Sequence, residues 1–100
     1  MDIYIKDFTS APGGRYKKEG NFSGEKFRED YLEPLFSNGQ NEPINIFLDG
    51  TEGYPSSFLE EAFGGLARKI GDKELVKSKI KLISEDPILV REILTYIDNA

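Results

Sequence analysis

The sequence predicts a small α/β domain built on a mainly parallel sheet of three to four strands that is packed with helices. Segments of strand character alternate with segments of helical character along the whole chain of 100 residues. One of these segments, residues 44–48, is almost uninterrupted apolar sequence, which is typical of a central strand buried on both faces of a parallel sheet. Parallel strands joined by helices require right-handed crossovers. We expect one domain over residues 1–100.

The first third of the chain contains one predicted strand and one predicted helix. The strand covers residues 3–8, and the breaker Pro12-Gly13-Gly14 ends regular pairing. Ser23 is the predicted N-cap of a helix that Pro34 bends, because proline cannot donate a hydrogen bond to Asp30. The predicted apolar face of this helix contains Phe27, Tyr31, Leu32, Leu35 and Phe36, and its predicted solvent face contains Arg28, Glu29 and Glu33.

The middle of the chain is a strand, a turn and a helix in direct succession. The strand covers residues 44–49, and the helix covers about residues 58–70, where Gly71 closes it. Gly64 and Gly65 lie inside this helix although glycine has low helix propensity. They therefore predict that the helix backbone packs closely against a neighbour, most simply the sheet.

The last third of the chain contains a helical turn, a strand and a final helix. The turn covers residues 72–78, and residues 80–83 form a strand in which apolar residues alternate with lysines. Asp86 and Pro87 suit the N-cap and the first position of the final helix. The predicted packing face of this helix contains Leu89, Val90, Ile93, Leu94 and Ile97.

The composition excludes several classes of function. The net charge of −5 repels a phosphate backbone, so we expect no binding to nucleic acid and favour a basic protein partner. The chain has no cysteine and no histidine, which removes thiol and imidazole chemistry, and we expect no catalytic residue, metal site or cofactor. No run approaches the roughly 20 apolar residues of a membrane span, and the N-terminus does not resemble a secretory signal. We therefore expect a cytoplasmic protein.

Polar residues gather where the predicted middle strand ends. Asp49 closes the strand, and a glycine-containing turn leads to the adjacent Ser56 and Ser57 near the start of the helix. In open α/β sheets, the carboxyl ends of the strands are where ligands and partners bind. Ser57 and Glu60 also fit a capping box, in which two backbone N–H groups are satisfied reciprocally. The serine pair therefore has three interpretations, namely a helix cap, a seat for an anion, or a phosphorylation switch.

We predict that a partner binds at this end of the sheet and at a basic loop. The loop Arg15-Tyr16-Lys17-Lys18 carries three positive charges that suit a phosphate or an acidic surface. The candidate partner-binding residues are Asp49, Gly50, Glu52, Gly53, Tyr54, Phe58, Arg15 and Tyr16, and the candidate phosphorylation sites are Ser57 and Ser56.

Two sets of motifs resemble known domains. Leu48-Asp49-Gly50-Thr51-Glu52-Gly53-Tyr54-Pro55-Ser56-Ser57-Phe58-Leu59 resembles the signature of STAS domains, the fold of bacterial anti-sigma-factor antagonists, in which a strand ending in Asp leads to an Asp-Ser-Ser-Gly turn that opens a helix. Arg15-Tyr16, Ser23-Gly24-Glu25 with Phe27-Arg28, and Ser56-Ser57-Phe58-Leu59-Glu60-Glu61-Ala62-Phe63-Gly64-Gly65-Leu66 resemble a family of bacterial STAS-like domains of unknown function. This second resemblance spans about residues 15–97.

The STAS resemblance implies a regulatory mechanism. In STAS domains, a partner kinase phosphorylates the serine at the helix start, and this step breaks binding to that kinase. Carried over by position, the switch serine is Ser57, with Ser56 as its neighbour and Asp49 at the end of the preceding strand. The implied partner is a kinase-like ATPase or an anti-sigma-type factor. Pro55 and Phe58 depart from the signature, which has Asp and Gly at these two places.

Three hypotheses follow. The first is a non-enzymatic regulatory module that binds a protein partner and is switched by serine phosphorylation. The alternative is a magnesium-dependent phosphoryl-transfer or phosphate-binding domain that uses strand-end carboxylates such as Asp49, Glu52 and Asp7, since hard oxygen ligands suit that ion. The third is a homo-oligomer or a part of a larger assembly, with residues 80–84 or the aromatic Tyr4 and Tyr16 as its contact surface.

Overall fold

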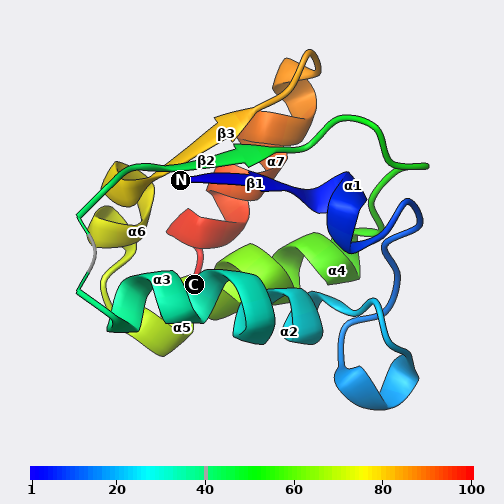
Figure 1. Ribbon diagram of the computed structural model, residues 1–100, viewed down its shortest axis with the longest axis horizontal. Coiled ribbons are helices and arrows are strands. Elements are labelled where there is room, and N and C mark those ends of the chain that lie inside the picture. Colours follow the sequence, from blue (N-terminus) through cyan, green and yellow to red (C-terminus); the bar gives the residue numbers. More distant parts are fainter. Residues whose placement is uncertain (40) are drawn as a thin grey trace.

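Three parallel strands form the sheet, in the order β1-β2-β3 (Figure 1). The computed structural model describes residues 1–39 and 41–100. Strand β1 (Asp2–Tyr4) and strand β3 (Ile80–Ile83) flank β2 (Ile44–Phe47). The register aligns Ile46 of β2 with Ile3 on one side and with Leu82 on the other. The predicted fold class is confirmed, with a parallel sheet of three strands packed against helices.

Strand β1 is shorter than predicted, because its partner strand ends. Tyr4 pairs with Phe47, the last residue of β2, and the N–H of the following Leu48 bonds instead to the carbonyl of Ile83 at 3.0 Å. The chain after Tyr4 therefore has no ladder to continue and turns into helix α1 (Ile5–Phe8), which buries Ile5 completely. The prediction of a strand through residue 8 was wrong for this reason.

A helical segment with a π-helical centre carries the chain from β1 to β2. After the short 3-10 helix η1 (Lys17–Glu19), it consists of α2 (Gly24–Phe27), η2 (Arg28–Leu32) and α3 (Glu33–Ser37). The predicted N-cap is confirmed, since the Ser23 hydroxyl accepts a hydrogen bond from the Lys26 N–H at 3.1 Å. The wider hydrogen bonding of η2 lies directly before Pro34, where the missing N–H interrupts regular α-helical pairing.

A second helical segment carries the chain from β2 to β3. It consists of α4 (Ser56–Leu59), η3 (Glu60–Gly64) and α5 (Gly65–Ile70), and Gly71 ends it in the left-handed conformation with φ of 78°. We refer to residues 56–70 as the central helical segment. Helix α6 (Lys73–Lys79) follows and leads into β3.

The last helix, α7 (Pro87–Asp98), begins as predicted. The Asp86 carboxylate accepts hydrogen bonds from the N–H groups of Ile88 and Leu89 at 3.0 and 3.3 Å, and Pro87 occupies the first turn. None of the helices in the described part of the chain combines the length and the apolar character that crossing a bilayer requires.

The helices cover one face of the sheet. Both crossovers advance in the same direction, from β1 to β2 to β3, so right-handed connections place both helical segments on the same side (Figure 1). Ile3, Ile44 and Ile46 are buried beneath them in the core. The opposite face carries Asn45 and Phe47, which remain partly exposed. The prediction that β2 is buried on both faces was therefore wrong, because consecutive crossovers in one direction leave one face uncovered.

Two glycines let the helices approach one another at backbone distance, and a third makes room for a side chain. A Cβ atom on Gly24 of α2 would overlap the carbonyl oxygen of Phe58 and lie 3.1 Å from the backbone nitrogen of Ala62. A Cβ atom on Gly64 would lie 3.2 Å from the Tyr96 carbonyl oxygen of α7, and one on Gly65 would meet the Arg28 guanidinium. The prediction that Gly64 and Gly65 face the sheet was wrong, since they face α7 and Arg28.

Substituting Gly24→Ala is expected to lower the free energy of unfolding by about 2–3 kcal/mol, because the added methyl group must separate α2 from α4. Gly13→Ala is the matched control, since a Cβ atom at Gly13 meets nothing within 4 Å. Urea unfolding of both variants measures the difference. Equal stability of the two variants would show that α2 and α4 do not pack at backbone distance.

Candidate functional site

The loop that joins β2 to the central helical segment lies at the carboxyl end of the sheet. We call residues 49–55 the rim loop. Two of its glycines, Gly50 and Gly53, adopt φ angles of 100° and 123°, which only glycine adopts without strain. The loop borders a shallow depression of about 160 Å³ lined by Leu48, Asp49, Gly50, Thr51, Gly53, Tyr54, Asp86 and Leu89. Four of the predicted site residues, Asp49, Gly50, Gly53 and Tyr54, thus come together around one depression.

Asp49 fastens the start of the rim loop to the segment after β3. One carboxylate oxygen accepts a hydrogen bond from the Ser84 hydroxyl at 2.6 Å, and the other accepts one from the Glu85 N–H at 2.8 Å. Both hydrogen bonds lower the pKa of Asp49, and the bond from Ser84 has the larger effect. Both carboxylate oxygens are thus engaged within the chain, and the side chain acts as a clamp between β2 and β3.

Tyr54 and Glu52 anchor the remainder of the rim loop. The Tyr54 hydroxyl donates a hydrogen bond to the Leu48 carbonyl, and burial raises the pKa of this half-buried phenol. The backbone N–H of Glu52 donates to the Ser10 carbonyl at 2.7 Å, which ties the loop to the segment after α1. The Glu52 side chain is exposed. The loop therefore has a fixed backbone and presents Glu52 and Gly53 to solvent.

The two serines begin the helix without capping it. Helix α4 starts at Ser56, its N-cap is Pro55, and no side chain makes a cap hydrogen bond there. The Pro55 carbonyl accepts the first helical bonds, from the N–H groups of Phe58 and Leu59 at 3.1 and 3.3 Å. The predicted capping box of Ser57 and Glu60 was wrong, because Pro55 already provides the extended residue that precedes the helix.

The serine side chains are therefore not used as caps. Ser56 is exposed, and its hydroxyl lies within hydrogen-bonding reach of the Tyr96 hydroxyl on α7. Tyr96 itself donates to the Glu92 carboxylate at 2.8 Å. Ser57 is half-buried. Both hydroxyls lie at the end of the sheet that carries the rim loop, as predicted, but they cap nothing.

A network of arginines and glutamates occupies the side of the central helical segment that carries Glu60 and Glu61. We call Arg15, Arg28, Arg68, Glu60 and Glu61 the Arg–Glu network. Glu60 accepts hydrogen bonds from Arg15 and, at 2.5 Å, from Arg68. The hydrogen bond from Arg68 has the largest effect on the pKa of Glu60 and lowers it, and the bond from Arg15 lowers it further. Burial acts in the opposite direction. The network thus connects the loop around Arg15 to the first turns of the helix.

Arg28 and Glu61 form the buried part of this network. They are 9% and 8% exposed, respectively, and the Arg28 guanidinium donates to the Glu61 carboxylate and, at 3.0 Å, to the Glu61 carbonyl. Its Nε also donates to Glu33 at 2.7 Å. The prediction that Arg28 faces solvent was wrong. Helical spacing alone does not show that Gly65, one turn after Glu61, leaves a space that the guanidinium fills.

The family model of the STAS-like domain of unknown function (DUF4325) matches residues 23–88 of the chain. The chain belongs to this family. The match includes β2, β3, the rim loop and both serines, and it leaves β1 and Arg15 outside. The searches of curated proteins and of solved structures returned no match. A STAS-like domain indicates a regulatory protein-interaction module, and such domains are typically non-enzymatic.

Two predicted partner-binding residues of this STAS-like domain have internal roles. Phe58 is completely buried between Phe27 and Tyr54, whose ring centroids each lie 6.0 Å away, so its side chain cannot contact a partner and that prediction was wrong. It is buried because the helix starts at Ser56 and turns this position toward the core. Arg15 is partly exposed but bonded to Glu60, whereas the neighbouring Tyr16 is 43% exposed.

The carboxylates of the STAS-like domain do not assemble into a metal site in residues 1–39 and 41–100, where no three or more Asp or Glu side chains gather with suitable geometry. Asp49, the residue on which the magnesium hypothesis depends most, already accepts two hydrogen bonds from its own chain. The geometry therefore favours a clamp at Asp49 over a ligand for a cation.

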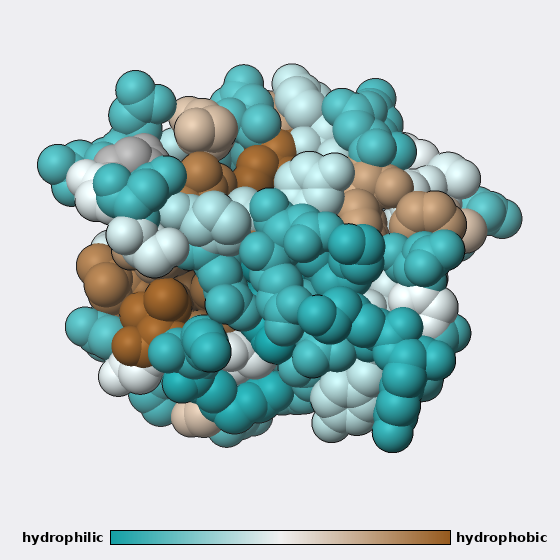
Figure 2. All heavy atoms as spheres, turned by 60° about the horizontal axis from the view of Figure 1, so that its bottom comes forward, coloured by the Kyte–Doolittle hydropathy of each residue, from teal (hydrophilic) through white to brown (hydrophobic). Residues whose placement is uncertain are grey.

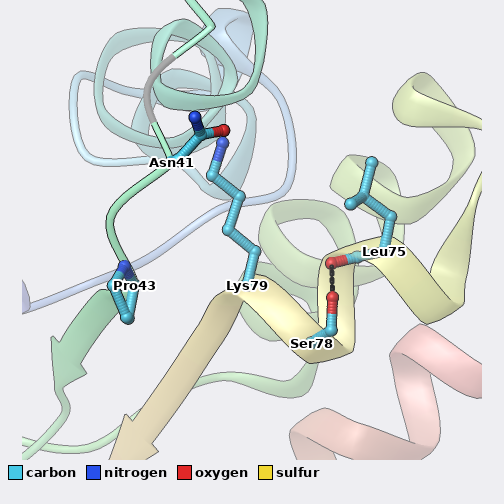
Figure 3. Close-up of a pocket in the computed structure, with 5 residues that line it drawn as sticks. All are labelled: Asn41, Pro43, Leu75, Ser78 and Lys79. Carbon is cyan, nitrogen blue, oxygen red and sulfur yellow. Dashed lines mark hydrogen bonds between the residues drawn. The ribbon is translucent and has the colours of Figure 1, made fainter.

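A larger depression, of about 250 Å³, lies at the opposite end of the sheet (Figure 3). It is lined by Asn41, Pro43, Leu75, Ser78 and Lys79. The Lys79 ammonium donates to the Leu35 carbonyl at 2.8 Å, and the Ser78 hydroxyl donates to the Leu75 carbonyl at 2.9 Å. The polar groups of this depression thus bond within the chain, as Asp49 and Tyr54 do at the rim loop.

The surface seen in Figure 2 is mainly hydrophilic, with apolar residues in several separate groups around a hydrophilic centre. A protein that binds through charge would meet carboxylates and ammonium groups in alternation there, as in the Lys26–Asp30 pair at 2.6 Å and the Lys17–Glu29 pair at 2.6 Å. These exposed pairs contribute little to stability. The Arg–Glu network differs from them because part of it is buried.

Replacing Ser84 by alanine is expected to raise the pKa of Asp49 toward 3.8, its unperturbed value, because the strongest hydrogen bond to the carboxylate is lost. A carbon-detected NMR titration of the Asp49 carboxyl measures this. Because the folded-state pKa lies below the unfolded value, the stabilisation by this clamp is present at neutral pH and is lost as the pH falls through the lowered pKa. Ser78→Ala serves as the control, and an unchanged Asp49 pKa in Ser84→Ala would contradict the clamp.

Substituting Arg28→Met is expected to lower the free energy of unfolding by about 3 kcal/mol, because the Glu61 carboxylate stays buried without its main partner. Lys26→Met removes the exposed Lys26–Asp30 pair instead and is expected to cost less than about 1 kcal/mol. Chemical unfolding at neutral pH compares the two. Similar losses in both variants would mean that the Arg28–Glu61 pair is not shielded from solvent.

Proposed function

We propose that this STAS-like domain is a non-enzymatic regulatory module that binds a protein partner through the rim loop and the first turn of α4. Phosphorylation of Ser57, or of its neighbour Ser56, by a kinase-like ATPase controls this binding. The partner is that ATPase or an anti-sigma-type factor. The observation that supports the proposal best is that two adjacent hydroxyls stand at a helix start and cap nothing.

Because neither hydroxyl makes a cap bond to the helix backbone, modification of either serine removes no cap. A capping serine would have to give up its bond to the backbone before its hydroxyl could react. Here Pro55 already provides the N-cap, so a phosphate at Ser57 leaves the helical hydrogen bonds intact. Modification can then change the binding surface without unfolding the helix start.

The rigid backbone of the rim loop suits it for docking. Asp49, Tyr54 and the Glu52 N–H each bind a different part of the chain, namely the segment after β3, the end of β2 and the segment after α1. A loop held at these places loses little conformational entropy on binding. The exposed side chains of Glu52 and Ser56 then lie on a preformed surface.

The charges around Ser57 explain how a phosphate would act. It adds about 1.5 to 2 negative charges at the N-terminus of the central helical segment, where the helix dipole favours an anion. Glu60 and Glu61 follow within one turn and oppose it. Arg15, bonded to Glu60 from a neighbouring loop, is a cation that a phosphate can recruit. The phosphate thus alters both the charge of the rim and the hydrogen bonds of Arg15.

The net charge of −5 favours a partner with a basic surface. Long-range attraction favours a basic surface, so the rim with its exposed Glu52 suits a positively charged patch on the partner. The magnesium-dependent alternative has less support, since the Asp49 carboxylate is already engaged by Ser84 and Glu85.

Substituting Ser57→Glu is expected to reduce capture of the partner from native cytoplasm by roughly tenfold or more, because it places a permanent negative charge at the docking surface. Ser57→Ala should retain capture. Ser78→Glu is the matched control, because it makes the same charge change at the opposite end of the sheet. A quantitative pull-down with tagged chains measures all three, and equal capture by Ser57→Glu and Ser78→Glu would contradict docking at the rim.

The phosphorylation step has its own measurement. Phosphopeptide mapping of the chain from native cells, with and without the captured ATPase, is expected to show phosphate on Ser57 or Ser56 only when the ATPase is present. Absence of phosphate from both serines under all conditions would remove the switch, while the docking result above would be unaffected.

A further inference from the structure

The face of the sheet that the helices leave open carries an ordered set of side chains. The register aligns them in two rows across the three strands, a polar row and an apolar row. We call these six residues the open face. The polar row is Asp2, Asn45 and Lys81, and the apolar row is Tyr4, Phe47 and Ile83.

The apolar row is unusual for the exposed side of a sheet. The rings of Tyr4 and Phe47 stack with centroids 4.3 Å apart and an angle of 9° between their planes, yet Tyr4 is 39% exposed. The Lys6 ammonium lies 5.8 Å from the centre of the Tyr4 ring. Parallel sheets occur almost only with both faces covered. In the described part of the chain, no element covers this face, which leaves its apolar row available to a partner.

We propose that the open face packs against the open face of a second copy of this chain, about a two-fold axis parallel to β2. Face-to-face sheets lie about 10 Å apart with nearly aligned strands. This symmetry places β1 over the partner's β3 and β2 over its own equivalent. It brings Asp2 opposite the partner's Lys81, Tyr4 opposite the partner's Ile83, and Phe47 opposite the partner's Phe47.

Charge complementarity favours a second copy of the chain as the partner and favours an axis parallel to β2. Asp2 and Lys81 stand at opposite ends of the polar row, so the two-fold operation superposes opposite charges at two places. A two-fold axis perpendicular to the strands would instead bring β1 over the partner's β1. Through the centre of the face it would place Asp2 against the partner's Tyr4, and along the polar row it would place Asp2 against the partner's Asp2. Like charges in direct opposition are destabilising. Of these two arrangements, only the axis parallel to the strands therefore makes the charges of the polar row complementary to those of the partner.

The charge of the whole chain points to the same face. Two copies with a net charge of −5 each repel one another over most of their surfaces. Among its six residues, the open face instead contains one carboxylate, Asp2, and one ammonium group, Lys81, and the Lys6 ammonium lies over the Tyr4 ring. It is thus a surface on which two copies approach without net repulsion, and its centre is apolar.

Dimerisation of this kind changes what the domain presents to a partner. An axis parallel to the strands keeps the strand direction, so the carboxyl ends of both sheets lie at the same end of the dimer. Two rim loops and two Ser57 side chains then face the same way. A partner with two binding sites would bind such a pair more tightly than a single domain.

A charge-exchange experiment tests the arrangement. Sedimentation velocity of the wild-type chain from about 10 μM to 1 mM should show a reversible dimer, in the weak range that a small interface gives. Asp2→Lys and Lys81→Glu should each weaken dimerisation by roughly tenfold or more, since each creates two like-charge contacts. An equimolar mixture of the two variants should form a heterodimer, because both contacts then join opposite charges. Circular dichroism verifies that each variant is folded.

Sedimentation velocity also measures the control variant and the outcomes that would contradict the proposed dimer. Ile88→Lys removes a large apolar side chain that is 69% exposed, lies in α7 and is not one of the six residues of the open face, and it should leave dimerisation unchanged. A wild-type chain that stays monomeric to 1 mM overturns the proposal, whether the face is bare or binds a different protein. Dimers insensitive to both variants, as pairing through strand edges would give, also overturn it. So does a failure of the mixture to associate.

Discussion

The close packing of the central helical segment against two neighbouring helices determines most of the structure. Gly24 brings α2 against the Phe58 carbonyl on one side, and Gly64 brings the Tyr96 carbonyl of α7 within reach on the other. At such distances a shift of one helix displaces both neighbours, because the interior has no free volume to absorb it. Phe58, Phe63 and Leu66 of the same segment are fully buried in the core. The start of this helix, and with it the rim, is therefore held in a fixed position.

The same packing explains why charged residues lie inside the helical layer. Glycines at 64 and 65 leave room beside the helix, and the Arg28 guanidinium fills part of that room and meets Glu61. A buried ion pair of this kind is weak evidence for stability, because desolvation of both charges offsets most of their attraction. Its effect is to restrict the arrangement. A placement of η2 on η3 that separated Arg28 from Glu61 would leave a buried charge without its partner.

Local patterns predicted the elements, and long-range contacts decided the details. The caps at Ser23 and Asp86 and the end at Gly71 followed from single residues, because each satisfies or replaces backbone hydrogen bonds nearby. The positions of Asp49 and the serines at the carboxyl end of the sheet followed from the strand before them. The end of β1 could not be predicted from local sequence, because β1 ends where its partner strand β2 ends. The paired residues Tyr4 and Phe47 are 43 residues apart in the chain. The burial of Arg28 likewise depends on a partner in a different segment.

The rim and the open face both follow from the order of the strands. Crossovers in one direction place every strand's carboxyl end beside the rim loop and, at the same time, leave one face without helices. The two surfaces meet at Lys6, whose ammonium lies over the Tyr4 ring while its Cδ atom lies 2.8 Å from where a Cβ of Gly50 would be. A long lysine side chain adjusts at low cost, so a protein bound at the rim can displace it without disturbing the stacked rings. The two surfaces therefore share a border but are free to act independently, since coupling between sites needs an element with two discrete arrangements and a flexible side chain is not one.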